Sequence, residues 1–187
     1  LSALNPVFDR SGEGTMTAGN STPLTDGAAA PLLASEDWAK KKNLPVLAYL
    51  TFAKVAAVNF IDDEGLLMAP AYAVSDMLKD ANLSLQDFEF YEIHEAFAAQ
   101  TIATLKAWQS AKFCRERLGR DQPMGPIDLA KLNVKGGSIA MGHPFAATGA
   151  RIVGVMAKLL AEKGSGRGLI SVCTAGGMGV TAIMEAA

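Results

Sequence analysis

The chain has 187 residues, of which 50% are hydrophobic, and a formal net charge of −2. This length suits about one domain, and the apolar content suffices for a full core. The balanced charge offers no basic face for nucleic acid or an anionic membrane. No apolar run approaches the roughly 18 residues of a membrane span.

Cysteine usage and the first residues bear on the setting of the chain. Its two cysteines, Cys114 and Cys173, make no disulfide framework and are typical of a reducing compartment. The sequence begins at Leu1 with no signal-peptide pattern. We expect it to be part of a longer protein whose upstream region, with any targeting sequence, is absent.

The first third of the chain alternates polar and apolar stretches. Residues 14–26 are rich in Gly, Ser, Thr, Asn and Pro and predict a loop. The apolar run over residues 27–34 is compatible with a strand or a helix, and we predict a buried strand. Ser35 is placed to cap a short helix that ends near Asn43. Residues 45–58, rich in β-branched and aromatic side chains, predict a second strand.

The middle of the chain predicts a helix, a strand and a second helix. Pro70 occupies the favoured first turn of a helix that Asn82 ends. Residues 88–94 (FEFYEIH) alternate in polarity and predict a third strand, followed by a helix over residues 95–108. His94 therefore lies at the carboxyl end of a strand, where open α/β sheets bind ligands.

The last third predicts a surface excursion, a helix and two strands. Residues 112–129 carry charge, glycine and proline, and Cys114 lies there in a basic turn that could lower its pKa or leave it a bystander thiol. Apolar residues at helical spacing follow Thr148, and residues 164–168 (GSGRG) break the chain after this predicted helix. Strands are predicted over residues 169–173 and 181–184 around a glycine-rich hairpin. This order predicts an α/β layered domain with a mostly parallel, five-stranded mixed sheet flanked by helices.

A glycine-rich turn over residues 136–151 (GGSIAMGHPFAATGAR) presents His143 just ahead of the last predicted helix. Pro144 holds the residue before it in an extended or turn conformation. A histidine positioned in this way is a candidate general base, since imidazole titrates near neutral pH. The alternative for this turn alone is a structural histidine whose ring nitrogens are both satisfied.

Three groups able to move protons occupy comparable places: His94 and Cys173 at strand ends, and His143 on the glycine turn. Their positions predict a shared site, with the glycines beside Cys173 exposing backbone N–H groups for an oxyanion hole. A thiol beside an imidazole acts as an acid or a base once it is partly thiolate. A zinc site made of the same three residues is the rival interpretation, disfavoured because no pair has the short spacing of zinc motifs.

Four ordered motifs, covering the chain nearly end to end, resemble the C-terminal half of the thiolase family, whose members cleave 3-ketoacyl-CoA with a second CoA. They are residues 17–30 (TAGNSTPLTDGAAA), 94–100 (HEAFAAQ), 136–151 (GGSIAMGHPFAATGAR) and 173–185 (CTAGGMGVTAIME). Most thiolases have asparagine at the position of His94. The histidine form resembles the thiolase subunit of the trifunctional complexes of fatty acid oxidation.

The resemblance implies that His143 is the base that activates the nucleophilic cysteine and then the incoming CoA thiol, with its ring N–H facing the thioester oxygen. Cys173 is implied as the acid/base that exchanges a proton with the acetyl-CoA carbanion. His94 would hold an oxyanion-hole water or donate directly, and the backbone N–H of Ala175 would complete a second oxyanion hole, where the family more often has glycine. Thr22 would line the CoA site, with Asn20 supporting its loop.

The resemblance also predicts the organisation and setting of the molecule. Residues 1–25 would be a loop segment left from the linkage to a missing N-terminal domain, and residues 26–187 the thiolase C-terminal domain. The implied substrates are acyl-CoA and CoA, with no cofactor and no metal. Implied partners are the N-terminal half, a second subunit in a homodimer, and a hydratase/dehydrogenase α-subunit, but no nucleic acid. The implied location is the bacterial cytoplasm, or the mitochondrion in a eukaryote.

One departure from the family is the nucleophilic cysteine, for which nothing in this sequence matches the motif. Cys114 lies in the wrong context to replace it, so we expect the chain alone to be inactive. Two alternatives remain: a fragment of a ketosynthase-type condensing enzyme, which pairs a cysteine with two histidines, and a non-catalytic acyl-CoA-binding or assembly module.

Overall fold

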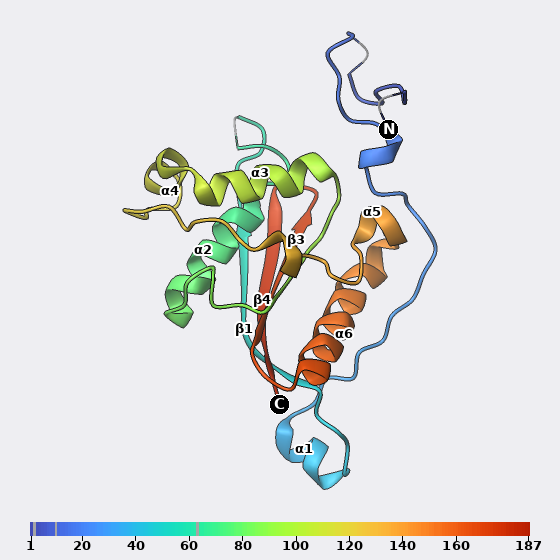
Figure 1. Ribbon diagram of the computed structural model, residues 1–187, viewed down its shortest axis with the longest axis vertical. Coiled ribbons are helices and arrows are strands. Elements are labelled where there is room, and N and C mark those ends of the chain that lie inside the picture. Colours follow the sequence, from blue (N-terminus) through green and yellow to red (C-terminus); the bar gives the residue numbers. More distant parts are fainter. Residues whose placement is uncertain (2, 10, 63) are drawn as a thin grey trace.

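A mixed sheet with helices on both faces forms the body of the molecule (Figure 1). The computed structural model describes residues 1, 3–9, 11–62 and 64–187. Within them the strands are β1 (Ala48–Ala57), β2 (Phe90–Ile93), β3 (Arg167–Thr174) and β4 (Met178–Ala186). The helices are α1 (Glu36–Lys41), α2 (Ala69–Ala81), α3 (Ala98–Gln109), α4 (Ala111–Glu116), α5 (Ser138–Met141) and α6 (Phe145–Lys163), with 3-10 turns η1 (Ala18–Asn20) and η2 (Leu129–Lys131).

The order of the strands across the described sheet is β1-β4-β3-β2. Strand β4 pairs antiparallel with β1 and β3, and β2 pairs parallel with β3. The predicted α/β layered fold with a mixed sheet is confirmed. Its mostly parallel character is wrong, because two of the three pairings between these strands are antiparallel.

The fifth predicted strand, over residues 27–34, is absent, and the sheet of the described residues has four strands. This run is irregular and exposed, and Leu32 is 72% exposed. The run is mostly alanine and leucine, which favour strands less than β-branched residues do, and Pro31 has no N–H to donate to a ladder. Hydrophobicity alone therefore gave the wrong prediction here.

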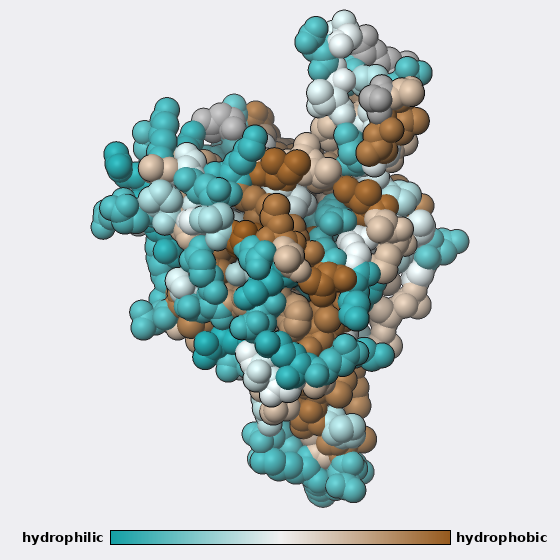
Figure 2. All heavy atoms as spheres, in the orientation of Figure 1, coloured by the Kyte–Doolittle hydropathy of each residue, from teal (hydrophilic) through white to brown (hydrophobic). Residues whose placement is uncertain are grey.

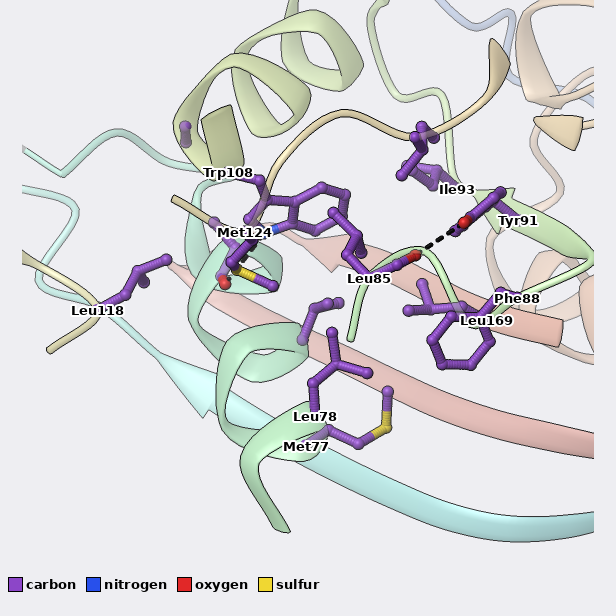
Figure 3. Close-up of a cluster of buried hydrophobic side chains, with 14 of the residues drawn as sticks. Met77, Leu78, Leu85, Phe88, Tyr91, Ile93, Trp108, Leu118, Met124 and Leu169 are labelled. Atoms are coloured by element: carbon purple, nitrogen blue, oxygen red, sulfur yellow. Dashed lines mark hydrogen bonds between the residues drawn. The ribbon is translucent and has the colours of Figure 1, made fainter. Parts of the chain in front are cut away.

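Helix α2 packs on one face of the sheet and α6 on the other, and each face has its own apolar core. Figure 3 shows the α2 side, where Trp108 and Phe88 are almost fully buried. The polar ends of its aromatic residues are satisfied: Tyr91 Oη donates to the carbonyl of Leu85 at 2.7 Å, and Trp108 Nε1 donates to that of Ala71 at 3.3 Å. This packing holds β2 and β3, whose ends carry site residues.

The two long helices end where the sequence predicts. Pro70 lies in the first turn of α2, and Asn82 ends that helix in the left-handed conformation with φ 52°. Helix α6 begins at Phe145, three residues before the predicted Thr148, and Gly164 ends it with φ 74°. A left-handed residue after the last turn is the usual helix terminator.

The predicted surface excursion over residues 112–129 is wrong in part. Four of its apolar side chains are buried and belong to the α2-side core: Cys114, Leu118, Met124 and Ile127. Cys114 Sγ donates to the carbonyl of Trp108 at 3.3 Å. The sequence of this segment suggests a polar surface because its charged residues are numerous, yet its apolar side chains pack into the core.

None of the described helices is long and apolar enough to cross a bilayer.

Candidate active site

The structure brings the two histidines together. His94 directly follows β2, and its backbone N–H donates to the Ser171 carbonyl on β3 at 2.9 Å. His143 lies between α5 and α6, and its N–H donates to the Pro23 carbonyl at 2.9 Å. The ring centroids of His94 and His143 lie 4.2 Å apart at an interplanar angle of 44°. Segments about fifty residues apart in the sequence thus converge on one point.

Cys173 lies beside His94 on the wall of a small cavity. That cavity has a volume of about 10 Å³, and both side chains line it together with Thr101 and Ser171. The hydroxyls of Thr101 and Ser171 are buried without a hydrogen-bond partner in the described part of the chain. Burial raises the pKa of Cys173 to about 11, although the backbone amides of Cys173 and Ala96 partly offset this effect. The thiol is therefore protonated at neutral pH rather than partly thiolate.

His143 is held neutral by its surroundings. Burial, and then the positive charge of Arg151, lower the pKa of its imidazole. Its Nδ1 lies 2.6 Å from the hydroxyl oxygen of Thr148, and its ring lies 4.8 Å from that of Phe145, measured between centroids. A neutral imidazole with one nitrogen engaged has the protonation state that a general base needs.

His94 is more deeply buried than His143, with 3% of its surface exposed. Its pKa is lowered to about 4, chiefly by burial and to a smaller extent by His143 and Arg151. Its Nδ1 lies 2.9 Å from the hydroxyl oxygen of Ser138 on α5. His94 is therefore a neutral side chain at neutral pH and can take part in catalysis as a hydrogen-bond donor.

The polar loop before residue 27 reaches the same place. Thr22 Oγ1 donates to the Ser138 carbonyl at 2.8 Å, and the Thr22 N–H donates to the Ala96 carbonyl at 3.0 Å. Asn20 supports this loop locally: its Oδ1 accepts from the Thr17 N–H at 2.9 Å, and its Nδ2 donates to the Thr15 carbonyl at 2.8 Å. Thr22 is thus tied to both histidine-bearing segments.

Ala175 lies in the exposed turn between β3 and β4, two residues after Cys173. Its φ is not positive, whereas Gly176 and Gly177 have φ of 88° and 74°. A Cβ at position 175 is therefore not strained, so alanine can present its backbone amide here as glycine would. Its role in an oxyanion hole stays a prediction.

Sequence reasoning missed several polar residues next to the histidines. Glu92 lies in a strand that reads as half polar, yet it is 1% exposed, and burial raises its pKa to about 7 although Arg151 partly offsets the shift. Ser138 is fully buried, and Arg151 Nη2 donates to its hydroxyl oxygen at 3.4 Å. Of these residues, only Thr148 could have been found from its spacing, because it lies in the first turns of α6, five residues after His143.

The three candidate zinc ligands do not form a metal site in the described structure. Among residues 1, 3–9, 11–62 and 64–187, no three His, Cys, Asp or Glu side chains are grouped so that they could hold a metal ion. The convergent group is instead two neutral imidazoles and a protonated thiol. That set can accept, donate and relay protons and can donate hydrogen bonds to an oxyanion.

Comparisons with known proteins identify the family to which the chain is similar. Residues 44–186 match the model "Thiolase, C-terminal domain" and residues 1–37 match "Thiolase, N-terminal domain". A 3-ketoacyl-CoA thiolase from Yersinia pestis (strain Pestoides F) is 50% identical over 182 residues, which are 97% of this chain and 41% of the relative. The chain thus spans about two fifths of the length of the curated relatives that it matches.

Solved structures show the same likeness. An acetyl-CoA acetyltransferase from Bacillus anthracis aligns with a TM-score of 0.81 at 36% identity, over 100% of this chain and 42% of that one. The dimeric peroxisomal thiolase of Saccharomyces cerevisiae aligns with a TM-score of 0.82, also at 36% identity and over the same shares of the two chains.

Proposed function

This chain belongs to the thiolase family, and we propose that it carries the proton-transfer half of a 3-ketoacyl-CoA thiolase site. The reaction is CoA-dependent cleavage of a 3-ketoacyl-CoA to acetyl-CoA and a shortened acyl-CoA, as in fatty acid β-oxidation. The observation that carries this proposal is the convergence of His94, His143 and Cys173, with the two rings 4.2 Å apart and Cys173 on a cavity that His94 also lines.

In the first half of the reaction, His143 removes the proton from a nucleophilic cysteine that this chain does not supply. The resulting thiolate attacks the C3 carbonyl, and the C2–C3 bond breaks. The electron pair of that bond stays on C2, and the Cys173 thiol protonates it to give acetyl-CoA. A thiol with a pKa near 11 is protonated at neutral pH and therefore available as this acid.

In the second half, His143 removes the thiol proton of CoA, whose sulfur attacks the enzyme-bound acyl thioester. The shortened acyl-CoA leaves, and the nucleophilic cysteine is returned. Before CoA reacts, the proton that His143 took from the nucleophilic cysteine passes to the Cys173 thiolate, which restores both groups. The proton that His143 then takes from CoA returns to the departing nucleophilic cysteine, so the cycle balances. The lowered pKa of His143 keeps the imidazole neutral and ready to accept a proton in both halves.

Oxyanions form in both halves, and donors close to the base stabilise them. His94 is proposed to hold a water or to donate directly, and the Ala175 amide is proposed for the second oxyanion. The cavity beside His94, at about 10 Å³, is near the ~10–15 Å³ that one water needs. Thr22 is proposed to line the CoA site and Asn20 to support its loop, since both belong to the loop that joins the histidine segments.

The wider setting is part of the same proposal. It includes a loop segment over residues 1–25, a C-terminal domain over residues 26–187, and CoA and acyl-CoA as substrates without a cofactor. An N-terminal thiolase half, a homodimer and a hydratase/dehydrogenase α-subunit are the proposed partners. Bacterial relatives support a cytoplasmic location, with the mitochondrion as the eukaryotic counterpart.

Joining this chain to the N-terminal domain of the Yersinia relative tests the proposal. The joined protein should cleave a 3-ketoacyl-CoA only when CoA is present, and the 187-residue chain alone should not, since neither Cys114 nor Cys173 is placed as the nucleophile. A well-folded joined protein without turnover would count against the proposal. Binding of acyl-CoA by the chain alone, measured by calorimetry, would favour the non-catalytic module instead.

A further inference from the structure

Each histidine ring in the site contacts one buried hydroxyl through the same ring nitrogen. His94 Nδ1 lies 2.9 Å from Ser138 Oγ, and His143 Nδ1 lies 2.6 Å from Thr148 Oγ1. Ser138 is fully buried, and Thr148 is 1% exposed. A hydroxyl has one proton to donate, so its other contacts decide whether it donates to the ring or accepts from it.

The other contact of Thr148 fixes the direction of its bond to His143. Thr148 Oγ1 donates to the carbonyl of Pro144 at 3.2 Å, one turn back in α6. A carbonyl oxygen cannot donate, so this bond uses the only hydroxyl proton of Thr148. Both contacts are satisfied only when Nδ1 of His143 carries a proton and donates it to Thr148. In neutral His143, Nε2 is then unprotonated.

The other contact of Ser138 gives the opposite direction. Arg151 Nη2 donates to Ser138 Oγ at 3.4 Å, and a guanidinium group cannot accept. The hydroxyl proton of Ser138 remains, and within the described part of the chain its oxygen has no third partner. Donation of this proton to Nδ1 of His94 pairs the buried hydroxyl hydrogen of Ser138. In neutral His94, Nε2 therefore carries the proton.

We propose that Ser138 and Thr148 are positioning residues that hold His94 and His143 in opposite neutral tautomers. His94 then presents an N–H at Nε2, and His143 presents a basic nitrogen at Nε2. Neither Nε2 has a hydrogen-bond partner among the described residues. This inference rests on the proposed function for its meaning: the first ring is the oxyanion donor and the second is the base, although the two side chains are chemically alike.

Arg151 is the third member of the arrangement. Its contact fixes Ser138 as a donor. Burial is the main cause of the lowered pKa values of both histidines, and the positive charge of Arg151 adds to this effect. Among the described residues, two acidic ones are nearby. Burial raises the pKa of Glu92 to about 7 although Arg151 partly offsets this shift, and the Glu95 carboxylate accepts from the Ile139 N–H at 3.2 Å. A neutral state of both rings is what the two tautomers require.

Nitrogen NMR of the 15N-labelled chain measures these tautomers directly, because the sequence has only two histidines. Two-bond correlations between ring nitrogens and ring protons distinguish a protonated from an unprotonated nitrogen. At neutral pH we expect His94 to show unprotonated Nδ1 and protonated Nε2, and His143 to show the reverse. His94→Gln and His143→Gln assign the signals by leaving one ring each. Two rings in the same tautomer, or an imidazolium, would overturn the proposal.

Two variants test the hydroxyls themselves. Thr148→Val replaces the hydroxyl by a methyl group of similar size and should shift the proton of His143 from Nδ1 toward Nε2, while Thr148→Ser should keep the native shifts. The matched control is Thr181→Val, which removes another buried hydroxyl that donates to a carbonyl, that of Ile170, and should change neither ring. Native shifts in Thr148→Val would contradict the assigned role.

The wild-type measurement requires no variant to fold and no turnover. Failure of the tautomer assignment is therefore distinguishable from failure of the proposed function. If the two rings have opposite tautomers but the chain never supports thiolysis, only the proposed function is refuted. If thiolysis occurs with both rings in the same tautomer, only the tautomer assignment is refuted.

Discussion

At the scale of single residues, the site contains buried titratable groups whose effects on stability oppose one another. Burial lowers the pKa of His94 from 6.5 to about 4, so its contribution to stability is lost as pH falls through this window. Burial raises the pKa of Glu92 from 4.5 to about 7, so its contribution is present at low pH and lost as pH rises through about 7. The two slopes partly cancel between pH 4.5 and 6.5.

Substitution of Glu92 by Gln should remove one of these slopes. The difference in free energy of unfolding between Glu92→Gln and the wild type should shift in favour of the variant by about 2 kcal/mol between pH 5 and pH 8. The reason is that the wild type must ionise a buried carboxyl over this range, whereas the variant has no carboxyl at this position. Denaturant unfolding at the two pH values measures this difference. Glu162→Gln, at an exposed position in α6, is the control. An equal pH dependence in Glu92→Gln and wild type would show that Glu92 does not titrate as described.

At the scale of elements, the start of α2 fits against β4 at a glycine. Gly179 pairs with Cys173 on β3 and with Ala56 on β1. A Cβ built at Gly179 would lie 2.6 Å from the backbone nitrogen of Pro70 and 2.8 Å from the carbonyl carbon of Ala69. Backbone atoms cannot move aside as a flexible side chain can, so only glycine fits here without shifting the helix.

We predict that Gly179→Ala destabilises the chain by about 1–3 kcal/mol, the usual cost of overpacking. Gly154→Ala is the matched comparison, since it adds the same methyl group within α6, where nothing lies within 4 Å. It should stabilise the chain by about 0.5–1 kcal/mol through helix propensity. Thermal or denaturant unfolding of both variants measures these changes. If both glycines respond alike, the close approach of α2 and β4 is not real.

Element boundaries were predictable from the sequence where local chemistry decides them. Pro70, Asn82 and Gly164 mark helix ends through their own backbone preferences, and all three do so in the structure. The strand predicted over residues 27–34 was wrong because an apolar run is compatible with several structures, and its burial depends on the surrounding elements. The predicted mostly parallel pairing of the strands was wrong for a similar reason, since strand pairing is set by packing of segments that are distant in sequence.

The candidate site shows the same division. Histidines and a cysteine at strand and helix boundaries indicated convergence, and the structure brings His94 next to both His143 and Cys173. The contact between His94 and Ser138 joins residues 44 positions apart and could not be read from spacing. Glu92 was hidden because alternation predicts one exposed face, whereas β2 is covered on both.

At the scale of the whole molecule, an open apolar groove of about 800 Å³ lies between the segment before β1 and α6. Leu32 beside it is 72% exposed, Phe145 at the start of α6 is 71% exposed and Val55 on β1 is 73% exposed. Figure 2 shows hydrophobic residues gathered in a band down the middle of one face. Apolar surfaces of this kind mark interfaces.

The chain alone should therefore bind a hydrophobic dye and associate as its concentration rises. Fluorescence of the dye and sedimentation at several concentrations measure these effects. Joining the Yersinia N-terminal domain should reduce the dye signal if that domain covers the apolar surface. A clean monomer of the chain alone that binds no dye would contradict this expectation.

The most direct test of the proposed roles separates the two halves of the reaction in the joined protein. In the proposed mechanism, exchange of labelled CoA into an acyl-CoA uses the base His143 and involves no change of a carbon–carbon bond, whereas thiolysis of a 3-ketoacyl-CoA also uses the acid Cys173. We predict that Cys173→Ala abolishes thiolysis and retains exchange, and that His143→Gln abolishes both. A Cys173→Ala protein that still cleaves the substrate would instead fit a ketosynthase-type enzyme. Retention of both reactions in His143→Gln, or loss of both in a folded Cys173→Ala protein, would contradict the division of roles.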